Sequence, residues 1–233
     1  MIRTHSLLAG ALIFAAAASP VLASVTIGAP GDSGSGNSFP FGGGVPQYQQ
    51  LYDANNFSGP IDITGVTFFN KNYTPGSVNS ADYSFQLSTS SATVGNLSTN
   101  FASNIGADNT TIFSGTLGGP VDTTTHEFTV TGTHDFMYDP SKGNLLLNIT
   151  DDGTTDNASV YLDAINSSNN YFSRAYSYGS ASYSDGWGLV TRFNSDATVP
   201  TPEPASFAAF GFGALGLFAM ALKARKNRTV SQS

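Results

Sequence analysis

A run of aromatic residues between positions 171 and 187 is the strongest candidate for a binding surface in this chain. The faces of Tyr and Trp rings stack on sugar rings, and their polar groups form hydrogen bonds. Arg174 and Asp185 lie within the run and could add charged contacts. The alternative interpretation is ordinary strand packing, because Tyr is common on half-exposed strand faces. The residues of the predicted glycan-binding face are Tyr176, Tyr178, Tyr183 and Trp187.

The histidines of residues 24–200 offer little for catalysis. His126 is expected at a strand edge and His134 in a turn, with Glu127, Asp135 and Asp139 nearby, but their spacing matches no metal motif. Serine is abundant, yet no Gly-x-Ser-x-Gly nucleophile elbow lies between a strand and a helix. We therefore expect no catalytic residue, no cofactor and a protein that is not an enzyme.

One acidic segment is a candidate calcium site. Asp151, Asp152 and Asp156 supply several carboxylate oxygens within a single loop, and calcium prefers such hard ligands. The order of these residues does not follow the EF-hand pattern. Asp-Gly and Asp-Asn pairs are also typical of hairpin turns, so a solvated turn is the alternative interpretation.

The charge of the central part excludes one class of ligand. Residues 24–200 contain four basic and fifteen acidic residues, a net charge of −11. A surface of this sign repels phosphate backbones, so we expect no nucleic-acid binding. The chain has no Cys, which excludes disulfides and thiol chemistry. With 177 residues, this part is long enough to form one domain with its own core.

Short segments rich in β-branched and aromatic residues alternate with turn residues throughout this part of the chain. Apolar and polar residues alternate from Ile61 onward, and the phase changes at Gly65, which indicates a β-bulge. The predicted strands are Gln47–Tyr52, Ile61–Phe69, Tyr83–Ser88, Thr110–Leu117, Glu127–Thr131, Leu145–Thr150, Ser159–Asp163, Tyr171–Tyr178 and Trp187–Phe193, with a further candidate at Val25–Gly28.

The number and spacing of these strands predict an all-β fold. We expect an antiparallel β-sandwich of the jelly-roll type, with a small barrel as the alternative. One short helix is expected where Leu97, Phe101 and Ile105 recur at a spacing of four. Residues 29–44 are rich in Gly, Pro, Ser and Asn and are expected to form an irregular loop.

Residues 1–23 have the three parts of a secretory signal peptide. Arg3 and His5 form a basic head, residues 7–18 are apolar, and small residues precede a cleavage site between Ala23 and Ser24. This pattern predicts export by the Sec machinery and cleavage by signal peptidase. A retained N-terminal anchor is the alternative interpretation.

The C-terminal segment, residues 201–228, also has three parts, and residues 229–233 follow it as a short tail. Pro202, Glu203 and Pro204 favour an extended backbone without local hydrogen bonds. Residues 205–222 carry no charge, and the last sixteen of them would form a helix about 24 Å long, close to the thickness of a bilayer core. A basic cluster then predicts a cytoplasmic stop in the inner membrane. Its members are Lys223, Arg225, Lys226 and Arg228.

This arrangement of a Pro-Glu-Pro element, a hydrophobic span and a basic cluster resembles the PEP-CTERM sorting signal. That family's tail is sometimes labelled an ice-binding protein C-terminal domain. The resemblance implies a Gram-negative bacterial host and recognition at Pro202, Glu203 and Pro204 by exosortase, an integral-membrane protease or transpeptidase. It further implies removal of the hydrophobic tail and transfer of the protein to the envelope or its polysaccharide.

Together these features predict an exported protein of the cell surface or extracellular matrix. We expect an inner-membrane-anchored precursor, and a mature form that is at the cell surface or extracellular. A polysaccharide-binding, lectin-like module is the alternative, and a secreted hydrolase is the least favoured interpretation because no residue can be named for its chemistry.

Overall fold

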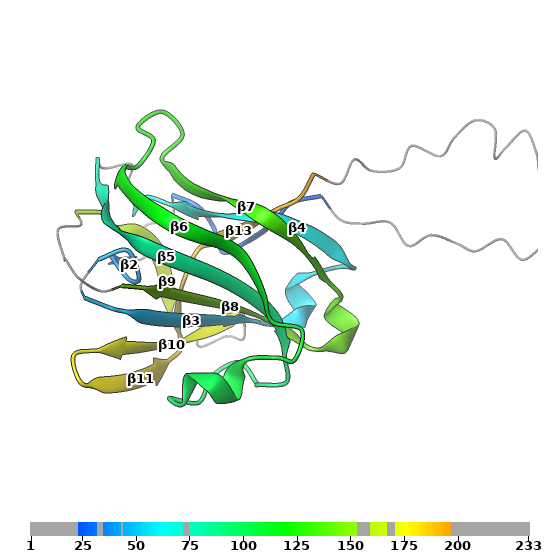
Figure 1. Ribbon diagram of the computed structural model, residues 1–233. Coiled ribbons are helices and arrows are strands. Elements are labelled where there is room, and N and C mark those ends of the chain that lie inside the picture. The colour runs from blue at the N-terminus through cyan, green and yellow to red at the C-terminus, as the bar shows by residue number, and fades with distance from the viewer. Residues whose placement is uncertain are drawn as a thin grey trace, which may run out of the picture. The chain divides into compact units, whose positions relative to one another are not determined.

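The structure is a computed structural model that describes residues 23–31, 35–42, 44–71, 75–152, 159–166 and 171–196. These residues form antiparallel strands and three short 3-10 turns, η1, η3 and η4, and contain no α-helix (Figure 1). The prediction of an all-β fold is therefore confirmed. The elements are β1 (Val25–Ile27), β2 (Ser35–Asn37), β3 (Gln47–Tyr52), η1 (Ala54–Asn56), β4 (Ile61–Phe69), β5 (Ser77–Ser90), η3 (Phe101–Asn104), β6 (Thr110–Pro120), β7 (Glu127–Tyr138), η4 (Pro140–Lys142), β8 (Asn144–Asp151), β9 (Leu162–Asn166), β10 (Phe172–Tyr178), β11 (Ala181–Asp185), β12 (Trp187–Leu189) and β13 (Thr191–Asn194).

The strands pair into three sheets. A four-stranded sheet has the order β1-β13-β4-β7, and a six-stranded sheet has the order β11-β10-β3-β8-β5-β6. A small third sheet has the order β12-β9-β2. Figure 1 shows β10 and β11 at one edge of the six-stranded sheet and β5 and β6 at the other.

The predicted bulge at Gly65 is present. The register between β4 and β7 shifts between Ile63 and Gly65, so the apolar side chains on either side of the shift stay in the core. A side chain at Gly65 would bring its Cβ within 2.6 Å of the carbonyl oxygen of Val130. Glycine is thus required here by the close approach of β7.

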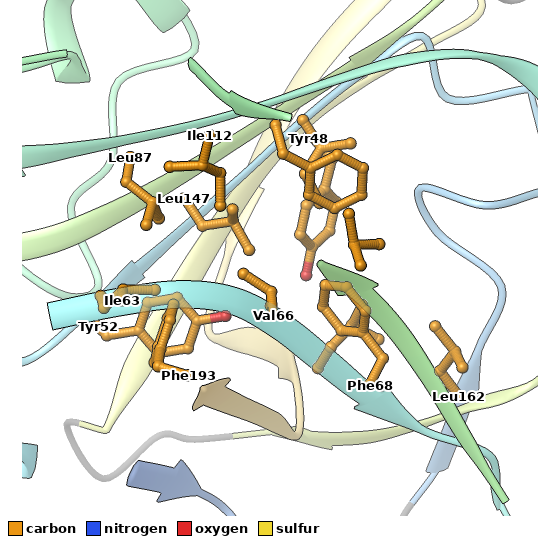
Figure 2. Packing of buried hydrophobic residues seen from close by; sticks show 14 of the residues in the cluster. Tyr48, Tyr52, Ile63, Val66, Phe68, Leu87, Ile112, Leu147, Leu162 and Phe193 are labelled. Atoms are coloured by element: carbon orange, nitrogen blue, oxygen red, sulfur yellow. The ribbon is translucent and has the colours of Figure 1, made fainter. Parts of the chain in front are cut away.

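Side chains from the four-stranded and six-stranded sheets share one hydrophobic core. The ring of Phe41 lies 5.1 Å from that of Phe68 in β4 and 6.1 Å from that of Phe85 in β5, measured between centroids. Tyr52 of β3 meets Phe193 of β13 edge to face, with centroids 4.8 Å apart. Figure 2 shows residues of both sheets gathered in this cluster. Burial of these large side chains is the main stabilising contribution.

Side-chain amides also join the sheets. The Gln50 side chain, fully buried in β3, donates from Nε2 to the carbonyl oxygen of Leu189 and accepts the Leu189 N–H at Oε1, both at 2.8 Å. It therefore pairs with the backbone of β12 much as a neighbouring strand would. Tyr48 donates its hydroxyl to the same Oε1 at 2.6 Å. These bonds satisfy polar groups that burial would otherwise leave without partners.

The helix expected around Leu97 is replaced by shorter structure. Only Phe101–Asn104 form a 3-10 turn, η3. Leu97 is nonetheless buried against Leu51 and Leu146, with Phe101 packed beside it, in a second small cluster. The spacing of four therefore predicts correctly that these apolar side chains pack together, although they do not form a helix. Asn104, whose amide bonds the backbone of residue 98 and the side chain of Gln49, holds the segment in a non-helical form.

Several strand boundaries also differ from the prediction. β7 continues through Gly132 to Tyr138, so His134 lies within a strand and not in a turn. The predicted strand at residues 187–193 is split at Val190 into β12 and β13, which belong to different sheets. β9 begins three residues after the predicted start, and β2 and β11 were not predicted. These strands are short and rich in Ser, Gly and Asn, so their apolar periodicity is weak.

We expect Phe41→Ala to destabilise the body by about 3–5 kcal/mol, because it opens a cavity among rings of both sheets. Phe41 is fully buried and also contacts Tyr83 and Phe128. Denaturant unfolding followed by the fluorescence of Trp187, the single Trp of the chain, measures the change. Met137→Ala, at a 56% exposed position, is the control and should change stability by less than about 1 kcal/mol. Equal effects of the two substitutions would contradict the assigned core.

Stability should also fall in alkaline solution. Burial raises the pKa of Tyr48, Tyr52, Tyr83 and Tyr138 above the ordinary value of a tyrosine. The unfolded chain then loses these protons above about pH 10 while the folded chain keeps them, so the free energy of unfolding decreases with rising pH. Unfolding measured at about pH 8 and about pH 11 tests this, and Tyr52→Phe should make the decrease shallower. Equal stability at both pH values would disprove the burial effect.

Candidate functional site

The β10–β11 hairpin brings the candidate aromatic residues together. Its two-residue turn begins with Gly179, whose φ of 59° fits the first central position of a type II′ turn. From this turn the register places Tyr176 opposite Tyr183 and Arg174 opposite Asp185. Side chains two residues apart on a strand share a face, so all four of these residues lie on one side of the hairpin.

The rings on this side form a continuous strip that includes one residue outside the predicted face. Tyr176 and Tyr183 stack with centroids 5.4 Å apart and planes at 26°. Phe39, from the loop between β2 and β3, lies 5.1 Å from Tyr176 and 6.0 Å from Tyr178. We call Phe39, Tyr176, Tyr178 and Tyr183 the aromatic strip. No sequence signal marks Phe39, because its place depends on how the loop folds back over β10.

An ion pair lies beneath the strip. Arg174 donates from Nε and Nη2 to the two carboxylate oxygens of Asp185, at 2.9 and 3.1 Å. The guanidinium carbon of Arg174 is 4.8 Å from the Tyr176 ring centroid and 5.7 Å from that of Phe39. Asp185 also accepts the backbone N–H of Trp187 at 2.9 Å. The bidentate pair and the two cation–π contacts fix the rings in place.

The tyrosine hydroxyl at the centre of the strip is neutral. Burial raises the pKa of Tyr176, and the nearby charge of Arg174 opposes this shift only in part. The hydroxyl therefore remains a donor and an acceptor of hydrogen bonds under physiological conditions.

Trp187, the fourth residue of the predicted face, belongs to β12 and pairs with Asn166 of β9. Like Phe39 and Tyr176, it packs against the main hydrophobic core. Its backbone touches the site through Asp185, but its ring makes no described stacking contact with the strip. The described ring contacts therefore join Tyr176, Tyr178 and Tyr183 of the prediction with Phe39, and none of them includes Trp187.

The histidines do not assemble a metal centre in the described part of the chain. No group of three or more His, Asp or Glu side chains is placed to hold a metal ion among these residues. His126 lies just before β7 with φ at 60°, and His134 is exposed on β7, where its Nδ1 is 3.2 Å from the Thr133 hydroxyl.

The calcium candidate is only partly described. Asp151 ends β8, and the backbone N–H of Asp152 donates to the carbonyl oxygen of Asp82 at 3.2 Å. Asp156 lies outside the described residues. Calcium binding at this loop therefore stays a prediction.

Most of the targeting residues also lie outside the described part, namely residues 1–22 and 197–233. Ala23 and Ser24 are described, and the Ser24 hydroxyl accepts the backbone N–H of Ser195 at 3.0 Å. Residues 202–204, residues 205–222 and the basic cluster at 223–228 are not described. Where the chain is described, it contains no helix of the length and apolar character that a membrane span needs.

Comparison with known proteins identifies the C-terminal segment. No curated protein and no solved structure matches the chain. A family model described as the PEP-CTERM protein-sorting motif matches residues 200–226, which contain Pro202, Glu203 and Pro204 and most of the basic cluster. This motif indicates an exported protein whose membrane-anchored precursor is processed by exosortase. The chain therefore carries a PEP-CTERM sorting motif, which follows the strands of an all-β body in the sequence.

Proposed function

We propose that this protein is displayed at the cell surface or in the extracellular matrix, and that its body is not an enzyme. In this proposal residues 1–23 direct Sec-dependent export and are removed by signal peptidase. Residues 205–222 then hold the precursor in the inner membrane until exosortase acts at Pro202, Glu203 and Pro204. The match of the PEP-CTERM sorting motif to residues 200–226 is the observation that carries this proposal.

The body is further proposed to be a jelly roll. With β1, β3, β4, β5, β6, β7, β8 and β13 counted as first to eighth, the two large sheets contain the orders 1-8-3-6 and 2-7-4-5. Each hydrogen-bonded pair 1-8, 2-7, 3-6 and 4-5 joins strands that lie opposite each other along one long folded hairpin. This nesting is the pattern of two Greek keys in a double-sheet jelly roll. β2 and β9–β12 are insertions in that scheme.

The ends of the body fit the proposed double processing. β1 and β13 are antiparallel neighbours, with Val25 opposite Phe193. The chain therefore enters and leaves the body at the same end of one strand pair, as the bond between Ser24 and Ser195 also shows. Cleavage before Ser24 or beyond Asp196 removes no residue of either strand. Such an arrangement lets both ends be processed while the fold is kept.

A second candidate function is the binding of extracellular polysaccharide by the body. The stacked, partly exposed rings of Tyr176 and Tyr183 favour this candidate. It is compatible with surface display, because a sorted protein can carry a binding surface.

Replacing Pro202, Glu203 and Pro204 together with alanine should block maturation in the native host. The alanines remove the fixed extended backbone and the carboxylate that exosortase is proposed to recognise. The unprocessed precursor should accumulate in the membrane fraction, as detected by immunoblot of fractionated cells. Thr201→Ala, one residue before the element, is the matched control and should mature normally. Normal processing of the triple variant would count decisively against the proposal.

Intact-mass analysis of the mature protein from its host should show two new ends. The N-terminus is expected at Ser24, and the C-terminus within the sorting segment, with the mass of any attached group added there. A mature mass that retains residues 205–222 would show a permanently anchored protein and would refute processing by exosortase.

A further inference from the structure

The aromatic strip combines two rings that pack against the core with two rings that are exposed. It consists of Phe39, Tyr176, Tyr178 and Tyr183, whose successive centroid separations are 5.1 to 6.0 Å. This spacing is comparable with the size of a single hexose ring, so successive sugars in a short stretch of a polymer can lie against successive side chains of the strip. The strip has two stacked steps, between Phe39 and Tyr178 and between Tyr176 and Tyr183.

The outer rings are available to a ligand. Tyr178 is 52% exposed and Tyr183 is 45% exposed, although both belong to a regular hairpin. A tyrosine ring that is covered by its neighbours has little area left to contact a ligand. These two rings instead leave close to half of their area in water, where stacking with a sugar would bury it.

The strip is fixed before any ligand arrives. Arg174 is 94% buried, is bound by both carboxylate oxygens of Asp185 and contacts the rings of Tyr176 and Phe39. Few side-chain rotations therefore have to be frozen on binding, which lowers the entropic cost of a weak, repeated contact. Tyrosine suits such a surface because it offers a large rigid area and a polar tip.

The edge of β11 adds hydrogen-bonding groups next to the rings. β11 is the last strand of the six-stranded sheet, and the described residues place no strand on its outer side. In a two-residue hairpin the residues flanking the turn bond each other, so backbone groups of alternate residues point outward. By this alternation the outward groups belong to Ser182 and Ser184, which flank Tyr183. Sugar hydroxyls can both donate to and accept from such groups.

The charges of the body and of the strip indicate which class of sugar the strip can bind. The body carries a net charge of −11, so an anionic polymer is repelled over most of its surface. At the strip, the charges of Arg174 and Asp185 neutralise each other, and Arg174 is the one cation that the described residues place against these rings. The described part of this surface therefore offers stacking and neutral hydrogen bonds.

From these observations we propose that the aromatic strip binds a neutral polysaccharide built of hexose units, stacked on Tyr178 and Tyr183 along the β10–β11 edge. The proposal deepens the second candidate function and does not depend on exosortase. A second copy of the chain, paired through the outer edge of β11, is the competing occupant of this surface. The test below distinguishes such a dimer from polysaccharide binding.

The test uses the purified full chain in detergent micelles. Affinity electrophoresis in gels with hydroxyethylcellulose, dextran or galactomannan should show retardation by at least one of these neutral polymers. Gels with alginate or dextran sulfate should show none. Tyr183→Ala and Tyr178→Ala should each weaken binding by about tenfold, since each removes one stacking face. Tyr183→Phe keeps the ring and should retain most of the binding.

Two exposed tyrosines elsewhere serve as matched controls. Tyr161 is 58% exposed and Tyr171 is 56% exposed, and alanine at either position should leave binding unchanged. Alanine at residues 202–204 should also leave binding unchanged, which separates this proposal from the sorting proposal. The proposal is overturned if no neutral polymer binds, if only anionic polymers bind, if the controls weaken binding as much as Tyr183→Ala does, or if the chain dimerises without binding any polymer.

Discussion

The position of β13 is the constraint on which the rest of the body depends. This last strand lies between β1 and β4, so the four-stranded sheet is incomplete until residues 191–194 are in place. Phe193 then enters the core against Tyr52 and Phe57, which come from a part of the chain well over one hundred residues earlier. With no disulfide to join these segments, long-range pairing and the shared aromatic core must hold them. Completion of the fold therefore waits for the end of the body.

This order of events suits a precursor held by its C-terminal end. Only ten residues separate Asn194 at the end of β13 from Ala205 at the start of the uncharged segment. When β13 pairs, the chain has already emerged almost up to its sorting signal. The sorting element is thus the next part of the chain to emerge once the body is complete. Because β13 ends at Asn194, cleavage beyond Asp196 removes no residue of this strand.

The sequence predicts features that depend on local alternation and misses those that depend on distant neighbours. The bulge at Gly65 can be predicted from the sequence because the alternation of apolar and polar residues changes phase at this glycine. The spacing of the apolar residues predicts correctly that Leu97 lies in a buried cluster. The predicted helix is not formed, because the side chain of Asn104 forms hydrogen bonds with the backbone of residue 98 and with the side chain of Gln49. β11 is too polar for an alternation signal, although the Gly-Ser pair between two tyrosine-bearing segments indicates a hairpin.

In the candidate site, too, some contacts can be predicted from local sequence, and others depend on residues that are distant in the sequence. Stacking of Tyr176 on Tyr183 follows from a hairpin register that a two-residue turn at Gly179 would fix. The inclusion of Phe39 does not follow from any local pattern, because it requires the preceding loop to cross β10. Trp187 is close to Tyr183 in sequence, yet the chain enters another sheet between them, and no described ring contact joins the indole to the strip.

The small number of basic residues in the body explains the electrostatic environment of the aromatic strip. Three of the four basic side chains in the body form described ion pairs, Lys142 with Asp139, Arg174 with Asp185 and Arg192 with Glu127. Most of the acidic residues therefore have no described basic partner, and the surface field is negative over much of the body. Exposed rings beside a paired acid and guanidinium carry no strong local charge. The Arg174–Asp185 pair creates that condition at the β10–β11 edge, so the same interaction orders the rings and supports the proposal of a neutral ligand.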